Sequence, residues 1–187
     1  MEYILKSVTE KDEHYLYDIL ELQQDNLPKN ISSEEKSKEG FVTVEHSFET
    51  ISQLAKNLPQ FVAVDPYDKV VGYVLAMDEN TKSIIPVLQP MFNLFNSLQY
   101  NEIQLSTQKI VVCGQACIGK EFRGIGLVGQ LYNFMRATLD NQFECCVTEI
   151  ATSNIRSRSA HKKVGFEEIH SFNDGKEDWE VVYWNWK

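Results

Sequence analysis

The sequence has no excess of basic residues. Its 187 residues include 18 Lys and Arg against 27 Asp and Glu, which gives a formal net charge of -9 at pH 7. Nucleic-acid affinity comes mainly from clustered cations that displace counterions, so this balance argues against a nucleic-acid partner. It favours a neutral or cationic small substrate, although an acidic surface also keeps many proteins soluble.

The chain also lacks long apolar runs and grouped metal ligands. No stretch approaches the ~18 consecutive apolar residues of a membrane span, and the N-terminus alternates apolar and polar residues, unlike a signal peptide. The four cysteines Cys113, Cys117, Cys145 and Cys146 have no histidines at zinc-binding spacing. We therefore expect a cytoplasmic protein with reduced thiols in its core, no metal and no membrane partner.

The apolar content is large enough for one sizeable core. Hydrophobic residues make up 43% of the chain and aromatic residues 11%. This length and composition fit one domain, and no repeat, linker or low-complexity tract divides the sequence. We expect a single domain over residues 1–187.

Hydrophobic periodicity predicts an alternation of strands and helices. The expected strands span 3–8, 60–65, 69–77, 109–118, 143–151, 167–172 and 179–186, and the expected helices span 12–24, 48–58, 127–139 and 155–164. Pro59 stops the second helix, and Gly165 follows the last one in the usual place of a helix-ending glycine. This order predicts an α/β (α+β) fold in which a mixed sheet is flanked by about four helices.

Two segments are harder to interpret. Residues 26–40 are polar, and we expect them to form a loop. Residues 79–108 contain an apolar stretch that is interrupted by Pro86 and Pro90. This segment is either an insertion on the substrate side or a short helix that merely covers the sheet.

The strongest local feature is the glycine-rich segment at 123–129, between a predicted strand and an amphipathic helix. Glycines let backbone N–H groups approach an anion, and a helix N-terminus adds about half a positive charge. A phosphate or pyrophosphate ligand is therefore expected. The spacing of Gly124, Gly126 and Gly129 also matches the dinucleotide fingerprint. However, charged residues separate the strand from Gly124, and too few residues follow Gly129 to complete that fold.

The same residues resemble motif A of the GNAT N-acetyltransferase superfamily, Q/R-x-x-G-x-G/A. Arg123 and Gly126 match this motif, Leu131 falls at the family's helix leucine, and Val128 replaces the final small residue. A second segment, at 154–166, resembles the family's N-x-x-A-x-x-L-Y-x-x-x-G-F. Asn154, Gly165 and Phe166 match it, whereas Ser157, Ala160 and His161 replace the family's alanine, leucine and tyrosine.

The resemblance implies a mostly antiparallel sheet of about six or seven strands. It also implies a splay between the strands at 109–118 and 143–151 and acetyl-CoA as a cosubstrate, with the pantetheine arm between those strands. The cofactor-binding residues that it implies are Ile118, Arg123, Gly124, Ile125, Gly126, Leu127, Val128, Gly129 and Asn154.

Transfer to an amine also needs groups that move protons. An alkyl amine with a pKa of ~10.4 is mostly protonated at neutral pH, so a base must remove a proton before attack. Glu149 resembles the glutamate that some family members use as the base, and His161 stands at the position of the family's tyrosine acid. The structural alternatives are a Glu149 carboxylate paired with a neighbouring cation and a His161 imidazole exposed on its helix.

The sequence thus predicts an acetyl-CoA-dependent N-acyltransferase that acts on a small-molecule or peptide amine by direct attack in a ternary complex. An inert acyl-CoA-binding or sensor module is the alternative, and a nucleotide-binding oxidoreductase is a weaker third hypothesis. The aromatic C-terminal strand at 179–186 is a candidate surface for a homodimer.

Overall fold

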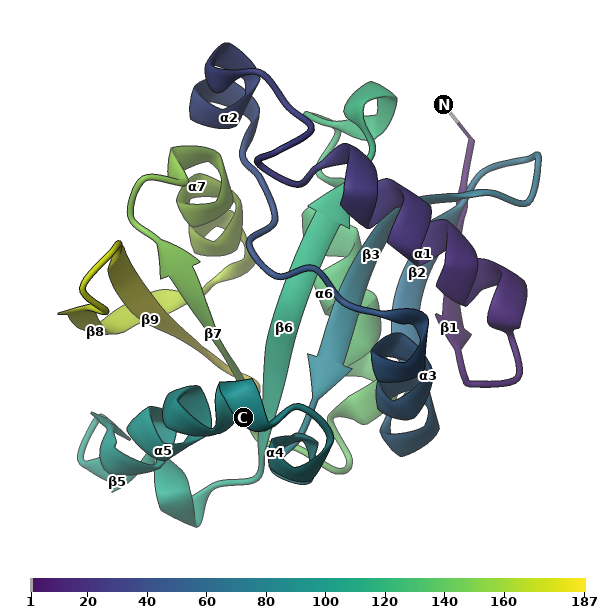
Figure 1. Ribbon diagram of the computed structural model, residues 1–187. Helices are drawn as coiled ribbons and strands as arrows, with labels where there is room; N and C mark the ends of the chain where they lie inside the picture. Colours follow the sequence, from purple (N-terminus) through teal and green to yellow (C-terminus); the bar gives the residue numbers. More distant parts are fainter. Residues whose placement is uncertain (1) are drawn as a thin grey trace.

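A seven-stranded mixed sheet runs through the protein (Figure 1), whose computed structural model describes residues 2–187 without the side chains of residues 33, 36 and 37. The strand order is β1-β2-β3-β6-β7-β9-β8, and every neighbouring pair is antiparallel except β6 and β7. The strands are β1 (Ile4–Val8), β2 (Gln60–Val64), β3 (Val70–Met77), β6 (Ile110–Ile118), β7 (Cys145–Ala151), β8 (Glu167–Asn173) and β9 (Asp178–Asn185). The predicted fold class is confirmed.

Helices cover both faces of the sheet. On one face lie α1 (Glu13–Asp25) and α3 (Phe48–Asn57), and on the other lie α6 (Leu127–Leu139) and α7 (Ile155–Val164). Successive strand residues point to opposite faces, so Tyr73 and Leu75 pack in the cluster under α1, whereas Val74 and Ala76 pack in the cluster under α6. Both faces of β3 are buried for this reason, and the strand consists almost entirely of apolar residues.

The prediction of a loop over residues 26–40 is wrong at its centre, where α2 (Ser33–Glu39) forms. Ser32 caps this helix, because its Oγ accepts a hydrogen bond from the backbone N–H of Glu35 at 3.1 Å. Gly40 follows the helix with a φ of 80°. The helix has no apolar residue, so hydrophobic periodicity could not reveal it.

Residues 79–108 cover the half of the α1 face that α1 and α3 leave open (Figure 1). This segment holds α4 (Thr81–Ile84), α5 (Gln89–Ser97), β4 (Gln99–Tyr100), β5 (Ile103–Gln104) and the 3-10 turns Pro86–Leu88 and Leu105–Thr107. Phe92, Phe95 and Leu105 are buried and pack in one cluster with Val147 and Val181 of the sheet. The structure therefore assigns this segment a covering role.

The C-terminal strand is not an edge. β9 lies between β7 and β8, and Trp184 and Trp186 are buried against the cluster under α6. The expectation that this strand is available to a second copy is wrong, because both of its edges are already paired within the chain. A homodimer stays a prediction, and strand β9 does not support it.

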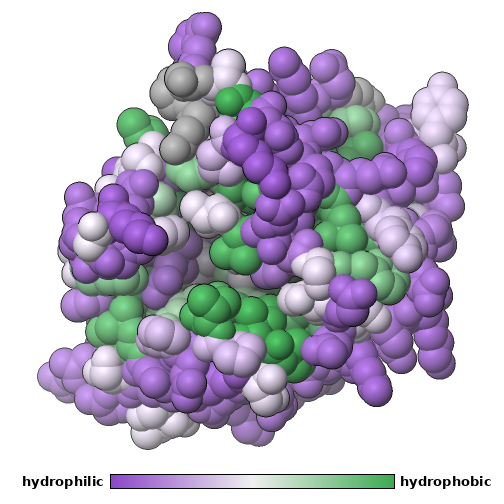
Figure 2. Space-filling view, viewed as in Figure 1, coloured by the Kyte–Doolittle hydropathy of each residue, from purple (hydrophilic) through white to green (hydrophobic). Residues whose placement is uncertain are grey.

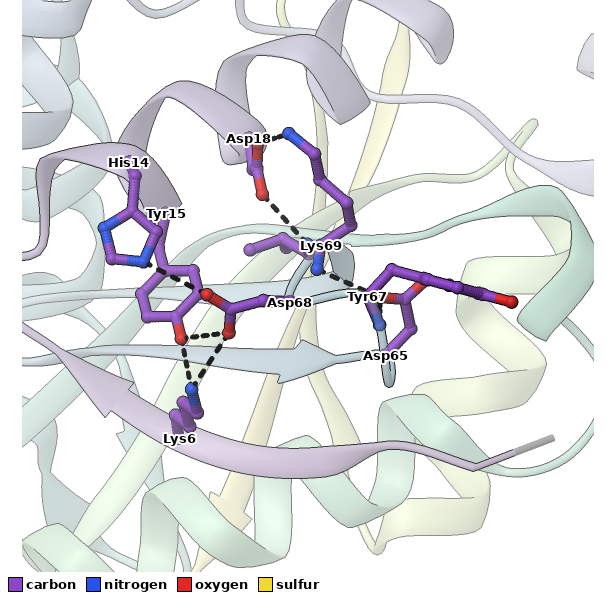
Figure 3. A network of polar contacts seen from close by, with 9 residues as sticks. Lys6, His14, Tyr15, Asp18, Asp65, Tyr67, Asp68 and Lys69 are labelled. Atoms are coloured by element: carbon purple, nitrogen blue, oxygen red, sulfur yellow. Dashed lines mark hydrogen bonds and ion pairs between the residues drawn. The ribbon is translucent and has the colours of Figure 1, made fainter.

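A polar network joins α1 to β1 and to the turn between β2 and β3 (Figure 3). The Tyr15 hydroxyl donates to Asp68 Oδ1 at 2.6 Å and accepts from Lys6 Nζ. One turn further along α1, Asp18 Oδ1 accepts from Lys69 Nζ at 2.8 Å. These contacts attach the first half of α1 to the sheet.

Among residues 2–187, no helix combines the length and the apolar character that crossing a membrane requires. The four cysteines are buried and unpaired with one another, as expected for reduced thiols in the core.

Candidate cofactor and catalytic site

The parallel strands β6 and β7 pair over only three residues each. The partners are Ile110 with Cys145, Val111 with Cys146 and Val112 with Val147. Beyond this point β6 continues in pairing with β3 alone, and β7 continues in pairing with β9 alone. The predicted splay between these strands is therefore present.

A bulge in β6 accompanies the separation. Leu75 of β3 lies opposite Gln115 and Ala76 lies opposite Cys113, so Gly114 has no partner in the register. A β-carbon at Gly114 would lie 2.3 Å from the Met77 methyl carbon. An unpaired residue bends and twists its strand, and a glycine admits the close approach of the neighbouring side chain.

The glycine loop leads from β6 into α6. Gly124 and Gly126 adopt left-handed φ values of 82° and 80°, and α6 begins directly afterwards at Leu127. Within the described part of the chain, the main-chain N–H groups from 124 to 129 have no hydrogen-bond acceptor. These N–H groups and the helix N-terminus form the environment that an anion prefers.

A cavity of about 550 Å³ adjoins this loop and reaches the end of β6, and no described residue of β7 is in its lining. Its walls come from the loop, α6, α7, the end of β6 and the segment at 39–42. Of the predicted site residues, those lining it are Ile118, Arg123, Gly124, Gly126, Leu127, Val128, Gly129, Asn154 and His161. Ile125 and Glu149 are not in the lining. The volume falls in the range of pockets that take a small molecule or cofactor.

Arg123 is held by contacts from three parts of the chain. Its Nε donates to the Ile118 carbonyl oxygen at 3.1 Å, and one terminal nitrogen donates to Asn26 Oδ1 at 2.5 Å. The other terminal nitrogen lies 3.5 Å from Glu35 Oε1 and 3.6 Å from Glu39 Oε2. The carbonyl of Ile118, a predicted cofactor-binding residue, thus already accepts one hydrogen bond from the protein.

Asn154 also has internal partners. Its Oδ1 accepts from the backbone N–H of Ser157 at 3.2 Å and caps α7, while its Nδ2 donates to the Phe41 carbonyl at 3.1 Å. The residue is 9% exposed and faces the cavity. The structure therefore gives Asn154 a positioning role for the cavity wall, and its direct contact with a cofactor stays a prediction.

The segment at 41–46 passes over the sheet beside the splay and is fixed by two glutamines. Gln115 Nε2 donates to the Val44 carbonyl at 2.8 Å. Gln23 Oε1 accepts from the His46 N–H at 3.0 Å, and Gln23 Nε2 donates to the His46 carbonyl at 3.3 Å. The two side chains replace the backbone partners that this extended segment would have in a sheet.

Glu149 lies on β7, on the same face as Val147 and therefore on the α1 side of the sheet. One carboxylate oxygen is buried without a hydrogen-bond partner. Burial raises the pKa of Glu149 to about 7, and the negative charge of Asp174 raises it further. The predicted alternative, an ion pair with a neighbouring Lys or Arg, has no counterpart in the described residues.

His161 is buried on α7, in the layer on the other side of the sheet. Its Nε2 lies 2.7 Å from the Tyr132 hydroxyl, and its Nδ1 lies 2.8 Å from the Ser157 carbonyl. Burial lowers the pKa of His161 to about 4, against a smaller opposing effect of the Ser157 carbonyl. The structural alternative of an exposed imidazole is wrong, and the two predicted catalytic residues lie on opposite faces of the sheet.

Hydrophobic residues gather over α4 and α5 beside a hollow at the centre of the α1 face (Figure 2). Residues of this segment that are not fully buried include Ile84, Leu88 and Met91, and Val87 is 76% exposed. The cover over the sheet thus also offers an apolar surface on the face to which Glu149 belongs.

Sequence reasoning missed several cavity residues, including Asn26, Glu39, Phe41, Val42 and Asn133. Asn26 and Glu39 reach the cavity through contacts with arginines far along the chain, for which the sequence carries no local signal. Arg156 also lines the cavity and pairs with Glu39.

Solved structures of acetyltransferases share this fold. Arabidopsis thaliana NAA60 in complex with acetyl-CoA has a TM-score of 0.64 at 12% identity, over 98% of this chain and 99% of that chain. The ribosomal-protein-S18-alanine N-acetyltransferase from Escherichia coli has a TM-score of 0.63 at 12% identity, over 98% and 94%. A GNAT-family acetyltransferase from Streptococcus agalactiae has a TM-score of 0.65 at 11% identity, over 99% and 96%.

No family model and no curated protein matches the sequence. The fold is nevertheless that of the GNAT acetyltransferases, which confirms the structural part of the resemblance.

Proposed function

We propose that this protein is an acetyl-CoA-dependent N-acyltransferase of the GNAT superfamily that transfers an acetyl group to a primary amine by direct attack in a ternary complex. The observation that carries the proposal is the set of free main-chain N–H groups at 124–129, which adjoins the cavity at the end of β6. These N–H groups make no hydrogen bond of their own that a diphosphate would have to displace. The fold neighbour that holds acetyl-CoA supports the choice of cosubstrate.

In the proposed complex, the glycine loop and the N-terminus of α6 hold the diphosphate. Arg123 and Arg156 supply positive charge on the cavity wall. The splay receives the pantetheine arm, because the facing edges of β6 and β7 beyond Val112 and Val147 are not paired with each other. Val128 borders the loop, so it limits the room beside the diphosphate.

Glu149 is the proposed base. Its carboxylate accepts a proton from the acceptor ammonium, directly or through water, and the neutral nitrogen then attacks the thioester carbonyl carbon. The tetrahedral species still carries a second proton on its nitrogen, which passes to water as the carbon–sulfur bond breaks, so the products are the neutral amide and CoA as a thiolate. A base works best when its pKa is close to the ambient pH, and burial brings the pKa of Glu149 to about 7.

The sequence assigned protonation of the thiolate to His161. Its place in the cavity lining supports a contact with the cofactor, whereas its lowered pKa and its two occupied ring nitrogens argue against proton donation. The histidine therefore supports cofactor binding better than it supports acid catalysis.

We place the acceptor on the α1 face, between the 79–108 segment and the turn that carries Asp174. Glu149 and Asp174 attract a cationic amine, and the apolar surface of α4 and α5 suits an acceptor with an apolar neighbouring group. Peptide and small-molecule amines both meet this description. Reduced thiols in the core fit the cytoplasm as the site of action.

An inert acyl-CoA-binding or sensor module is the second candidate function. The observation that favours it is the buried His161 in place of the family's tyrosine, because cofactor affinity and proton transfer depend on different residues.

Two measurements test the proposal. Titration calorimetry should show acetyl-CoA binding that Arg123→Ala weakens and Gly126→Asp abolishes, since the new carboxylate would repel the diphosphate. A thiol-release assay with a panel of peptide and small-molecule amines should then show turnover. Absence of acetyl-CoA binding in the wild-type protein would refute both candidate functions, whereas binding without turnover on any amine would select the sensor module.

A further inference from the structure

Glu39, the last residue of α2, contacts two arginines of the cavity wall. Its Oε2 lies 3.6 Å from a terminal nitrogen of Arg123 and also pairs with Arg156. These arginines come from the glycine loop and from α7, so they stand on separate walls. A carboxylate that bridges two guanidinium groups makes the contact that a phosphate oxygen would make with them.

The Glu39 carboxylate differs in charge from the other ionised side chains of the cavity wall. Arg123, Arg156 and Lys163 are the cationic side chains among the described lining residues, and Glu39 is the acidic one. Glu35, one turn earlier on α2, adds a second carboxylate to Arg123 at 3.5 Å. The cationic wall is therefore neutralised in large part from within the chain.

Among the side chains of α2 that the structure describes, polar contacts attach the helix to the rest of the protein. None of the described side chains between 33 and 39 belongs to a hydrophobic cluster, whereas Leu27 and Val42 on either side are buried in the cluster under α1. The helix is thus held between two anchored points mainly by its pairs with arginines. Such pairs can exchange for other anionic partners at a modest cost in free energy.

We propose that Glu39 is an internal competitor for the cofactor phosphates: it occupies Arg123 and Arg156, and it must release them when the diphosphate or the 3′-phosphate of acetyl-CoA binds there. Glu35 assists at Arg123. This inference rests on the proposed function, because it requires the cavity to bind CoA. It makes α2 a determinant of cofactor affinity although the helix belongs to neither sequence motif.

The test is the sign of the change in affinity when the charge of Glu39 is removed. In titration calorimetry with CoA, Glu39→Gln should lower the Kd about fivefold, as expected for the loss of two partly exposed ion pairs. Glu35→Gln should lower it less. Glu34→Gln is the matched control, because it removes the same charge from the same helix at a residue that pairs with Lys38; its Kd should change less than about twofold.

Two fragments of the cofactor separate charge competition from simple opening of the cavity. Adenosine 3′,5′-bisphosphate should gain affinity for Glu39→Gln, whereas uncharged S-acetylpantetheine should bind wild type and variant alike. An equal gain in affinity for both fragments would overturn the inference. An unchanged or higher Kd of Glu39→Gln for CoA would also overturn it, because Glu39 would then hold the arginines in place for the cofactor.

The outcomes also separate this inference from the proposed function. If the wild-type protein binds CoA and Glu39→Gln gives no tighter binding, the inference fails and the proposed function stands. If no form of the protein binds CoA, both fail. Circular dichroism and thermal unfolding of each variant show whether it is folded, and Glu35→Gln provides the readout if Glu39→Gln is not.

Discussion

The hydroxyl group of Thr148 donates a hydrogen bond to the main-chain carbonyl of Cys113 at 2.8 Å, one residue beyond the last paired position of β6 and β7. This side chain takes the place of the next backbone bond between the strands. It satisfies a buried carbonyl at the point where the strands separate, and it marks the closed end of the splay.

Thr148→Val should therefore lower stability without changing the shape of the side chain. The Cys113 carbonyl would remain buried and lose a donor, which costs about 1–2 kcal/mol. Chemical denaturation should show this loss, and Thr148→Ser, which keeps the hydroxyl, should restore most of it. Equal stability of Thr148→Val and wild type would show that the carbonyl finds another donor.

Glu149→Gln should abolish most of the turnover. General-base catalysis contributes about 10²–10⁴-fold to a rate, so kcat should fall by about that factor while acetyl-CoA affinity stays unchanged. In the wild-type protein, kcat/KM should rise with pH around the Glu149 pKa of about 7, because only the carboxylate accepts a proton. If kcat/KM of Glu149→Gln still rises with pH around 7, another group is the base.

The same residue should make stability depend on pH. Burial raises the pKa of Glu149 from 4.5 to about 7, so the folded state holds its proton more tightly than the unfolded state does. The stabilisation from the protonated carboxyl is complete below pH 4.5 and is lost as the pH rises through about 7. Between pH 4.5 and pH 8, the unfolding free energy of the wild-type protein should therefore fall by roughly 2 kcal/mol relative to that of Glu149→Gln. A pH-independent difference would mean that the carboxyl is well solvated.

Two glycines of the loop should respond to alanine in opposite ways. Gly126 has a φ of 80° with no atom within 4 Å of an added β-carbon, so Gly126→Ala should cost about 1 kcal/mol through its backbone conformation alone. Gly129 is already helical, and its β-carbon would lie 3.7 Å from Val164. Gly129→Ala should therefore raise the melting temperature, because alanine favours the helix. A lower melting temperature for Gly129→Ala would indicate that α6 and α7 pack too closely for a methyl group.

His161→Phe should change stability more than turnover. The substitution removes the bond between Nε2 and the Tyr132 hydroxyl, with a cost of about 1–3 kcal/mol. Thermal unfolding measures this cost, and kcat, measured where the variant is folded, should stay within about threefold of wild type. A loss of kcat above about tenfold, together with loss of one limb of its pH profile, would establish His161 as the acid.

The parts of the site that the sequence predicted are those with local causes. A glycine-rich turn into a helix places its N–H groups by backbone geometry alone, so the segment at 123–129 could be recognised without knowledge of the fold. Strand alternation likewise predicted the buried sheet. The α2 helix escaped prediction because its residues are all polar, and its position depends on ion pairs with arginines that lie about half the chain length or more away.

The state of the two candidate catalytic groups could not be predicted for a different reason. The pKa of Glu149 depends on burial and on Asp174, which lies in a turn between two later strands. The pKa of His161 depends on burial between α6 and α7, where the Tyr132 hydroxyl is hydrogen-bonded to Nε2 of the ring. Such environments result from tertiary packing, and residue type and spacing do not specify them.

Gln23 and Gln115 divide the connection between α1 and α3 into separate lengths of chain. Because they fix His46 and Val44, the part that carries α2 is a loop whose ends are held by α1 and by Val44. The segment at 41–46 has its own hydrogen bonds, so exchange of the α2 ion pairs would leave this wall beside the splay in place.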